Sequence, residues 1–119
     1  SIAIEGGSAG EKAAQAAGLT NTVVSDSQAL ALTEVTSGSA DACIIDLTMA
    51  NAMTGEGTGN KNLTYSIKLE AEEYGIAFRK GSDMTAKTNE LMAGMMKDGT
   101  LDKLAKQYQI VLIKNADNK

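Results

Sequence analysis

The stretch "SIAIEGGSAGEKAAQAAG" (residues 1–18) joins a strand pattern to a helix pattern through a pair of glycines. Residues 1–5 alternate apolar and polar side chains, which is typical of a strand. Small helix-forming residues then run from Ser8 to about Ala17, and Gly18 is well placed to end the helix. A strand that turns directly into a helix is the repeating unit of layered α/β domains.

The same alternation continues along the chain. The stretch "TNTVVS" (20–25) predicts a second strand, after which Ser25 or Asp26 can cap a helix that ends at Gly38. Residues 42–45 predict a short buried strand that turns helical at or just after Asp46. We therefore expect an α/β lobe of three layers with a mostly parallel sheet.

The second half of the chain predicts a polar loop, two further strands and two helices. The loop covers residues 54–62, and the stretches "LTYSIKL" (63–69) and "YGIAFRKG" (74–81) have strand patterns. A methionine-rich apolar stripe over residues 84–96 predicts a helix, and residues 101–108 predict another.

Composition excludes several classes of function. A net charge of −4 with scattered basic residues makes nucleic acid an unexpected partner. The chain has no histidine and one cysteine, Cys43, so it can form no internal disulfide and has few zinc ligands. No nucleophile has an adjacent base, and we therefore expect neither an enzyme nor a cofactor.

Two positions are candidates for ligand binding. Gly6 and Gly7 let the backbone leave the first strand, and Ser8 with Glu11 fits a capping box. This turn is either a structural cap or an anion site at a helix start. Asp46, at the end of a strand, either caps the next helix or binds a cation.

These two positions support each other if their strands are parallel. Ser8 and Asp46 then lie on one edge of the sheet, with hydrogen-bond donors on one side and an acceptor on the other. An α-amino acid zwitterion needs that pairing.

Four stretches of the sequence resemble a known family. They are "IAIEGGSAGEKAA", "SDSQALALTEVTSGSADACIIDLTMA", "EEYGIAFRKGSD" and "MKDGTLDKLAKQY". They follow one another in the order found in bacterial amino-acid-binding proteins of ABC importers, which are periplasmic solute-binding proteins of type II. The resemblance covers nearly the whole chain. It implies a ligand held between two lobes that close around it.

The resemblance also implies roles for particular residues. The ligand carboxylate would bind Ser8, Ala9 and the glycine turn at Gly7, and Asp46 would bind its ammonium group. Apart from the resemblance, Glu5 beside the turn either faces a cationic ligand side chain or is a solvated acid near a helix start, where its charge suits the helix dipole.

The family's first lobe has no counterpart in this sequence. Residues 1–79 resemble the second, ligand-binding lobe with its hinge-crossing strand, and residues 80–119 resemble helices and a tail that return to the first lobe. The implied partners are a small-molecule amino acid, the missing first lobe and an ABC transporter permease. The implied location is extracytoplasmic, in the periplasm or lipid-anchored at the cell surface, and the signal segment is not in this chain.

Without that lobe, we expect the methionine-rich face of residues 84–96 and the apolar run at 110–113 either to fold back onto the rest of the chain or to pair between chains, as a homodimer through the C-terminal helices. A ligand-binding lobe of a receptor or sensor ectodomain is the alternative function, and an assembly module without a ligand is a further one.

Overall fold

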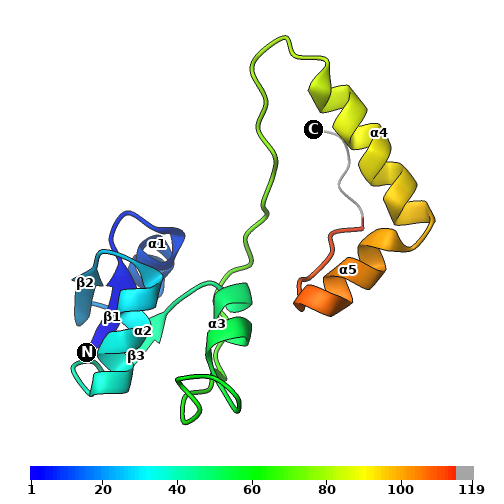
Figure 1. Cartoon of the computed structure of the whole chain (residues 1–119). Coiled ribbons are helices and arrows are strands. Elements are labelled where there is room, and N and C mark those ends of the chain that lie inside the picture. The colour runs from blue at the N-terminus through cyan, green and yellow to red at the C-terminus, as the bar shows by residue number, and fades with distance from the viewer. Residues whose placement is uncertain (115–119) are drawn as a thin grey trace. The chain divides into compact units, whose positions relative to one another are not determined.

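The structure, a computed structural model, describes residues 1–114 (Figure 1). The chain forms two compact units, Ser1–Ala71 and Glu72–Lys119. The elements in chain order are β1 (Ile2–Glu5), α1 (Ala9–Ala16), β2 (Thr22–Ser25), α2 (Gln28–Ser37), β3 (Ala42–Ile44), α3 (Leu47–Met53), α4 (Met84–Lys97) and α5 (Thr100–Tyr108).

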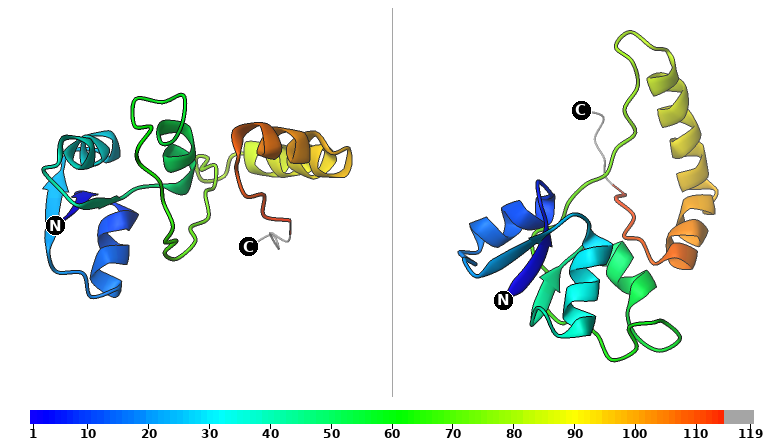
Figure 2. Two further views of the ribbon diagram at one scale, coloured as in Figure 1. Left: turned by 90° about the horizontal axis from the view of Figure 1, so that it is seen from below. Right: turned by 60° about the vertical axis from the view of Figure 1, so that its left-hand side comes forward.

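The first unit is built on a three-stranded sheet in the order β2-β1-β3. All pairs are parallel, with Ile4 of β1 opposite Val24 of β2 and Ile44 of β3. Helices α1 and α2 cover opposite faces of the sheet (Figure 2). The predicted α/β fold with a parallel sheet is therefore confirmed.

The core of this unit is small because alanine supplies most of it. Ala3 of β1 and Ala31 of α2 are fully buried and form a cluster with Ala40, against which Val35 and Cys43 pack. Small side chains let α2 lie close to the sheet, and they contribute little apolar area each.

The start of α2 differs from the prediction. Ser27, rather than Ser25 or Asp26, caps this helix, and its Oγ accepts from the Leu30 amide at 3.2 Å. Ser25 belongs to β2, is buried, and its carbonyl accepts from the Gly6 amide, so it is held in the sheet. The helix ends at Gly38 with a φ of 81°, as predicted.

The strands predicted at 63–69 and 74–81 are wrong, because the structure has no strand in either segment. A strand exists only where a neighbour pairs with its backbone. Within residues 1–114, the paired strands are β1, β2 and β3 alone. An alternating pattern gives a segment one apolar and one polar face, but it does not provide a neighbouring strand to pair with.

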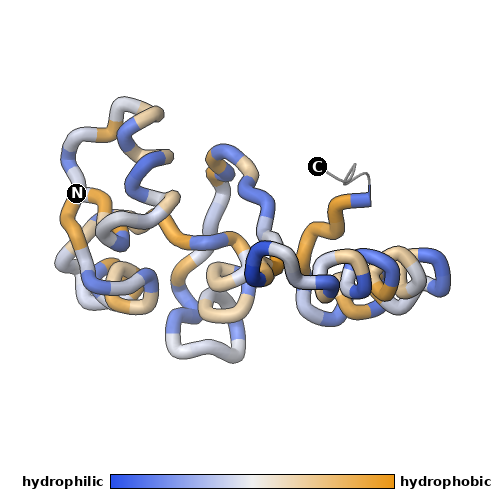
Figure 3. Tube along the Cα trace, turned by 90° about the horizontal axis from the view of Figure 1, so that it is seen from above, coloured by the Kyte–Doolittle hydropathy of each residue, from blue (hydrophilic) through white to orange (hydrophobic). Residues whose placement is uncertain are grey.

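The second unit contains α4, α5 and a short segment that returns along α5. Gln109 ends α5 with a φ of 54°, and the Ile110 amide donates to the Ala105 carbonyl. Lys114 Nζ then lies 2.9 Å from Asp102 Oδ1 in the first turn of α5. The returning residues 110–113 are hydrophobic (Figure 3).

No helix in the described part of the chain is long and apolar enough to cross a membrane.

Candidate ligand site at the carboxyl ends of the strands

The site predicted from the sequence lies where the strand order reverses. The chain passes from β1 through α1 to β2, and then crosses through α2 to β3 on the other side of β1. In open parallel sheets, ligands bind at the carboxyl ends of the strands beside such a reversal. The turn after β1 and Asp46 after β3 are both at these ends.

The glycine turn needs both of its glycines. Gly7 has a φ of 72°, a conformation that side chains disfavour. A Cβ on Gly6 would lie 2.9 Å from Val24 Cγ1, and the Gly6 amide donates to the Ser25 carbonyl at 3.2 Å. The turn is therefore fitted closely against β2.

Ser8 holds this turn in place with its hydroxyl group. Its Oγ accepts from the Glu11 amide at 3.2 Å and donates to the Glu5 carbonyl at 2.7 Å. A serine hydroxyl has one hydrogen, and here the Glu5 carbonyl receives it. Ser8 therefore orients the turn in this structure, and the donors for a ligand must come from the backbone.

Glu11 completes the cap in a way that differs from the predicted box. Its Oε2 accepts from the amide of Gly7 at 2.7 Å, whereas a standard box uses the amide of the cap residue, here Ser8. The amides of Ala9 and Gly10 donate to no acceptor within residues 1–114. These two amides are the donors at the start of α1 that a carboxylate can use.

Gly10 brings α1 against the end of β3. A Cβ at this position would lie 3.2 Å from Ile44 Cγ2, 3.3 Å from Ser8 Oγ and 3.5 Å from the Ile44 carbonyl oxygen. Ser8 and the residue at the end of β3 therefore border the same space. Gly10 was not predicted as part of the site, although a glycine in the first turn of an alanine-rich helix is a signal of close packing.

Asp46 is half-buried and caps α3. Its Oδ1 accepts from the Thr48 amide at 3.2 Å. The Asp46 amide donates to Oε1 of Gln28, the first residue of α2, at 2.7 Å. The predicted capping role is thus present, and a carboxylate has enough lone pairs to accept further donors. Gln28 was missed, because a bond over 18 positions leaves no local pattern.

Glu5 ends β1 and is half-buried. Its carbonyl is used by Ser8, and its side chain forms no hydrogen bond or ion pair within the described part of the chain. The structure therefore puts Glu5 next to the turn, as the sequence suggested, and leaves its role as a contact to a ligand side chain a prediction.

A shallow cavity elsewhere in the first unit does not belong to this site. Its volume is about 240 Å³, and it is lined by Ala13, Ala16 and Ala17 of α1 and its C-cap, with Leu69 and Glu70. It borders the carboxyl-terminal half of α1, whereas the turn lies at the other end. It offers few polar groups to a zwitterion.

No protein-family model, curated protein or solved structure matches this chain. Residues 1–114 contain no group of three or more cysteine or acidic side chains that could hold a metal ion.

Proposed function

We propose that the first unit binds the backbone of an α-amino acid at the carboxyl ends of β1 and β3. The ligand carboxylate accepts from the amides of Ala9 and Gly10, and the Asp46 carboxylate accepts from the ligand ammonium. The proposal depends on one observation above all: the position of Gly10, which lies against both Ser8 and Ile44.

The electrostatics of the two sides suit a zwitterion. The start of α1 presents amide donors and the positive end of the helix dipole, which favour a carboxylate. Asp46 supplies a negative charge at the start of α3. The Gln28 side chain accepts a hydrogen bond from the Asp46 amide and so holds the Asp46 backbone in place. Ser8 and Glu11 shape the turn and keep the Gly7 amide occupied.

The protein class that we propose is the solute-binding protein of an amino-acid ABC importer. The four stretches of sequence quoted above and the parallel sheet support it. Residues 1–79 are then the ligand-binding lobe, and residues 80–119 belong with a first lobe. The permease of the transporter is the further partner, and the protein works outside the cytoplasm.

A single lobe supplies only part of the contacts that a closed pair of lobes supplies. We therefore expect weak binding, with a Kd in the millimolar range, which corresponds to about −4 kcal/mol.

Titration of the ¹⁵N-labelled chain with a panel of L-amino acids, followed by NMR, tests the proposal. The expected shifts are largest in residues 7–11 and 44–48. For the best ligand, its N-acetyl derivative loses the ammonium and its amide loses the carboxylate. Each derivative should leave one of the two segments unshifted. A panel in which no amino acid shifts either segment, or an N-acetyl derivative that binds as well as its parent amino acid, would contradict the proposal.

A further inference from the structure

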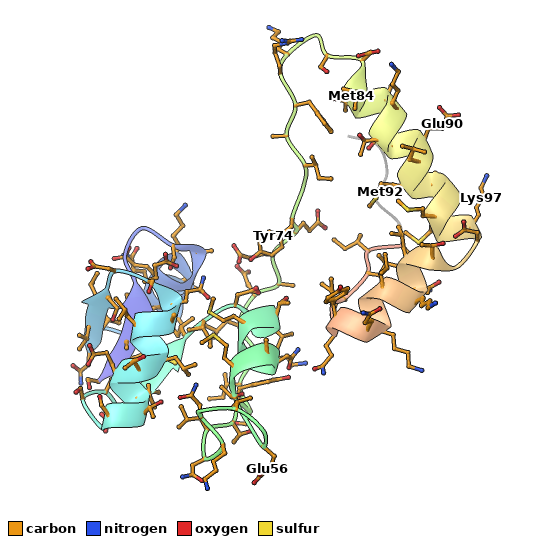
Figure 4. The ribbon with its side chains drawn as sticks, in the orientation of Figure 1. Glu56, Tyr74, Met84, Glu90, Met92 and Lys97 are labelled. Atoms are coloured by element: carbon orange, nitrogen blue, oxygen red, sulfur yellow. The ribbon has the colours of Figure 1, made fainter. Side chains whose placement is uncertain are left out.

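Both α4 and α5 carry exposed apolar side chains. Met84 and Met92 lie on one side of α4, and Glu90 and Lys97 lie on the other (Figure 4). The exposed large apolar residues of the two helices are Met84, Leu91, Met92, Leu104 and Tyr108. We call these five residues the α4–α5 face.

The returning segment enlarges this apolar surface. The ion pair between Lys114 and Asp102 joins the end of residues 110–113 to the first turn of α5. Ile110, Val111 and Ile113 in this segment are also exposed.

Helices α4 and α5 do not bury enough apolar surface by themselves to be stable. Leu101 is the one buried residue among residues 72–114. Helices of 14 and 9 residues are marginal in water unless an apolar face packs on something. The α4–α5 face therefore needs a cover, which a first lobe would supply in the proposed solute-binding protein and which the 119-residue chain must find in another way.

The available area matches what a stable dimer requires. The eight residues are between 39% and 80% exposed. Each of these side chains has on the order of 150–200 Å² of surface, about half of which is exposed, so the eight together offer roughly 600–800 Å² of apolar surface. Each partner in a standard interface contributes about 800 Å².

The distribution of charge suits contact with a second copy. In a two-fold interface every residue occurs twice, so a central charge would face its own kind. The α4–α5 face has no charged member, and two ion pairs lie on the same unit, Lys87 with Asp83 and Lys114 with Asp102.

We propose that the α4–α5 face, together with Ile110, Val111 and Ile113, binds the same surface of a second copy of this chain. The proposal is independent of the ligand site, which lies in residues 1–71.

Sedimentation equilibrium of the full chain, across micromolar concentrations and at low and high salt, tests the proposal. We expect a dimer in both buffers, because burial of apolar surface is not screened by salt. Leu91 is 67% exposed on α4. Because Leu91 occurs twice in the dimer, Leu91→Lys should raise the dimer Kd by at least about a hundredfold.

Leu30→Lys is the matched control, since Leu30 is an exposed leucine on α2 and should leave the dimer Kd unchanged. Residues 1–71 carry eight acidic and three basic side chains. If residues 1–71 of the second copy covered the α4–α5 face instead, high salt or Leu30→Lys would weaken dimer formation. Either result would overturn the proposal. A monomer at every concentration would overturn it as well. Circular dichroism checks that each variant keeps its helices.

Discussion

The side chain of Gln28 accepts a hydrogen bond from the backbone amide of Asp46 at 2.7 Å, across 18 positions of the chain. This bond ties the first residue of α2 to the cap of α3. It satisfies an amide at the edge of the sheet where the proposed ligand binds. Three helices, α1, α2 and α3, begin at this edge, and Gln28 connects two of them.

Replacing Gln28 by alanine should destabilise the first unit by about 1 kcal/mol, the net contribution of one such hydrogen bond. Urea unfolding measures the loss, and faster hydrogen exchange at the Asp46 amide locates it. Gln28→Glu keeps an acceptor oxygen and should restore the protection of this amide. Gln15→Ala, at an exposed position on α1, is the control. Unchanged exchange at Asp46 in Gln28→Ala would show that the bond is absent in solution.

Two glycine substitutions in helices should have different consequences for stability. Alanine is more favourable than glycine inside a helix by about 1 kcal/mol. Gly94 in α4 has open space around it, so Gly94→Ala should stabilise α4 by about this amount. At Gly10 the added Cβ meets Ile44 and Ser8 at 3.2 Å and 3.3 Å, so α1 or β3 must shift.

Gly10→Ala should therefore gain less stability than Gly94→Ala and weaken amino-acid binding. Thermal unfolding and NMR titration measure the two effects. Binding that is as strong in Gly10→Ala as in the unmodified chain would mean that the ligand does not use the start of α1.

Asp46→Asn and Asp98→Asn form a matched pair of variants. Each aspartate accepts from the amide of a threonine two positions later, Asp46 at 3.2 Å and Asp98 at 2.9 Å. Hydrogen bonds from Thr100 hold the pKa of Asp98 below its usual range. Both variants should therefore lose a similar local bond to a carboxylate.

Only Asp46→Asn should affect ligand binding. Loss of a charge-assisted hydrogen bond costs about 1.5–3 kcal/mol, so a millimolar ligand should become undetectable by NMR titration. Equal affinities in Asp46→Asn and Asp98→Asn would remove Asp46 from the site.

Local signals in the sequence were sufficient for much of the fold. The alternation in residues 1–5, the cap at Ser8 and the stop at Gly38 are each determined within a few positions, and the structure has all three. The same reasoning failed at residues 63–69, where an alternating pattern has no strand to pair with. Pairing depends on distant residues, as does the bond between Gln28 and Asp46.

At the candidate site, the sequence located Ser8 and Asp46 because parallel strands bring their carboxyl ends to one edge. It could not show that the hydroxyl hydrogen of Ser8 is given to the Glu5 carbonyl. It also missed Gly10, whose importance depends on the closeness of Ile44.

The stability of the first unit should depend on pH through the thiol of Cys43. Partial burial against the alanine cluster raises the pKa of the Cys43 thiol, because burial disfavours the thiolate. The folded state therefore keeps its proton to higher pH than the unfolded chain, in which a cysteine has a pKa of about 8.5. The stabilisation that the Cys43 thiol contributes is fully present below the pKa of the unfolded chain, and it is lost as the pH rises through the pKa of the folded state.

Urea unfolding at a series of alkaline pH values should show a fall in the free energy of unfolding that Cys43→Ala reduces. Alkylation by iodoacetamide supplies an independent measurement, since only the thiolate reacts. The folded chain should react more slowly than the same chain in urea at equal pH. Equal rates in the two states would show that Cys43 is not protected by the packing of α2 on the sheet, and the pH dependence of stability would then need another titrating group.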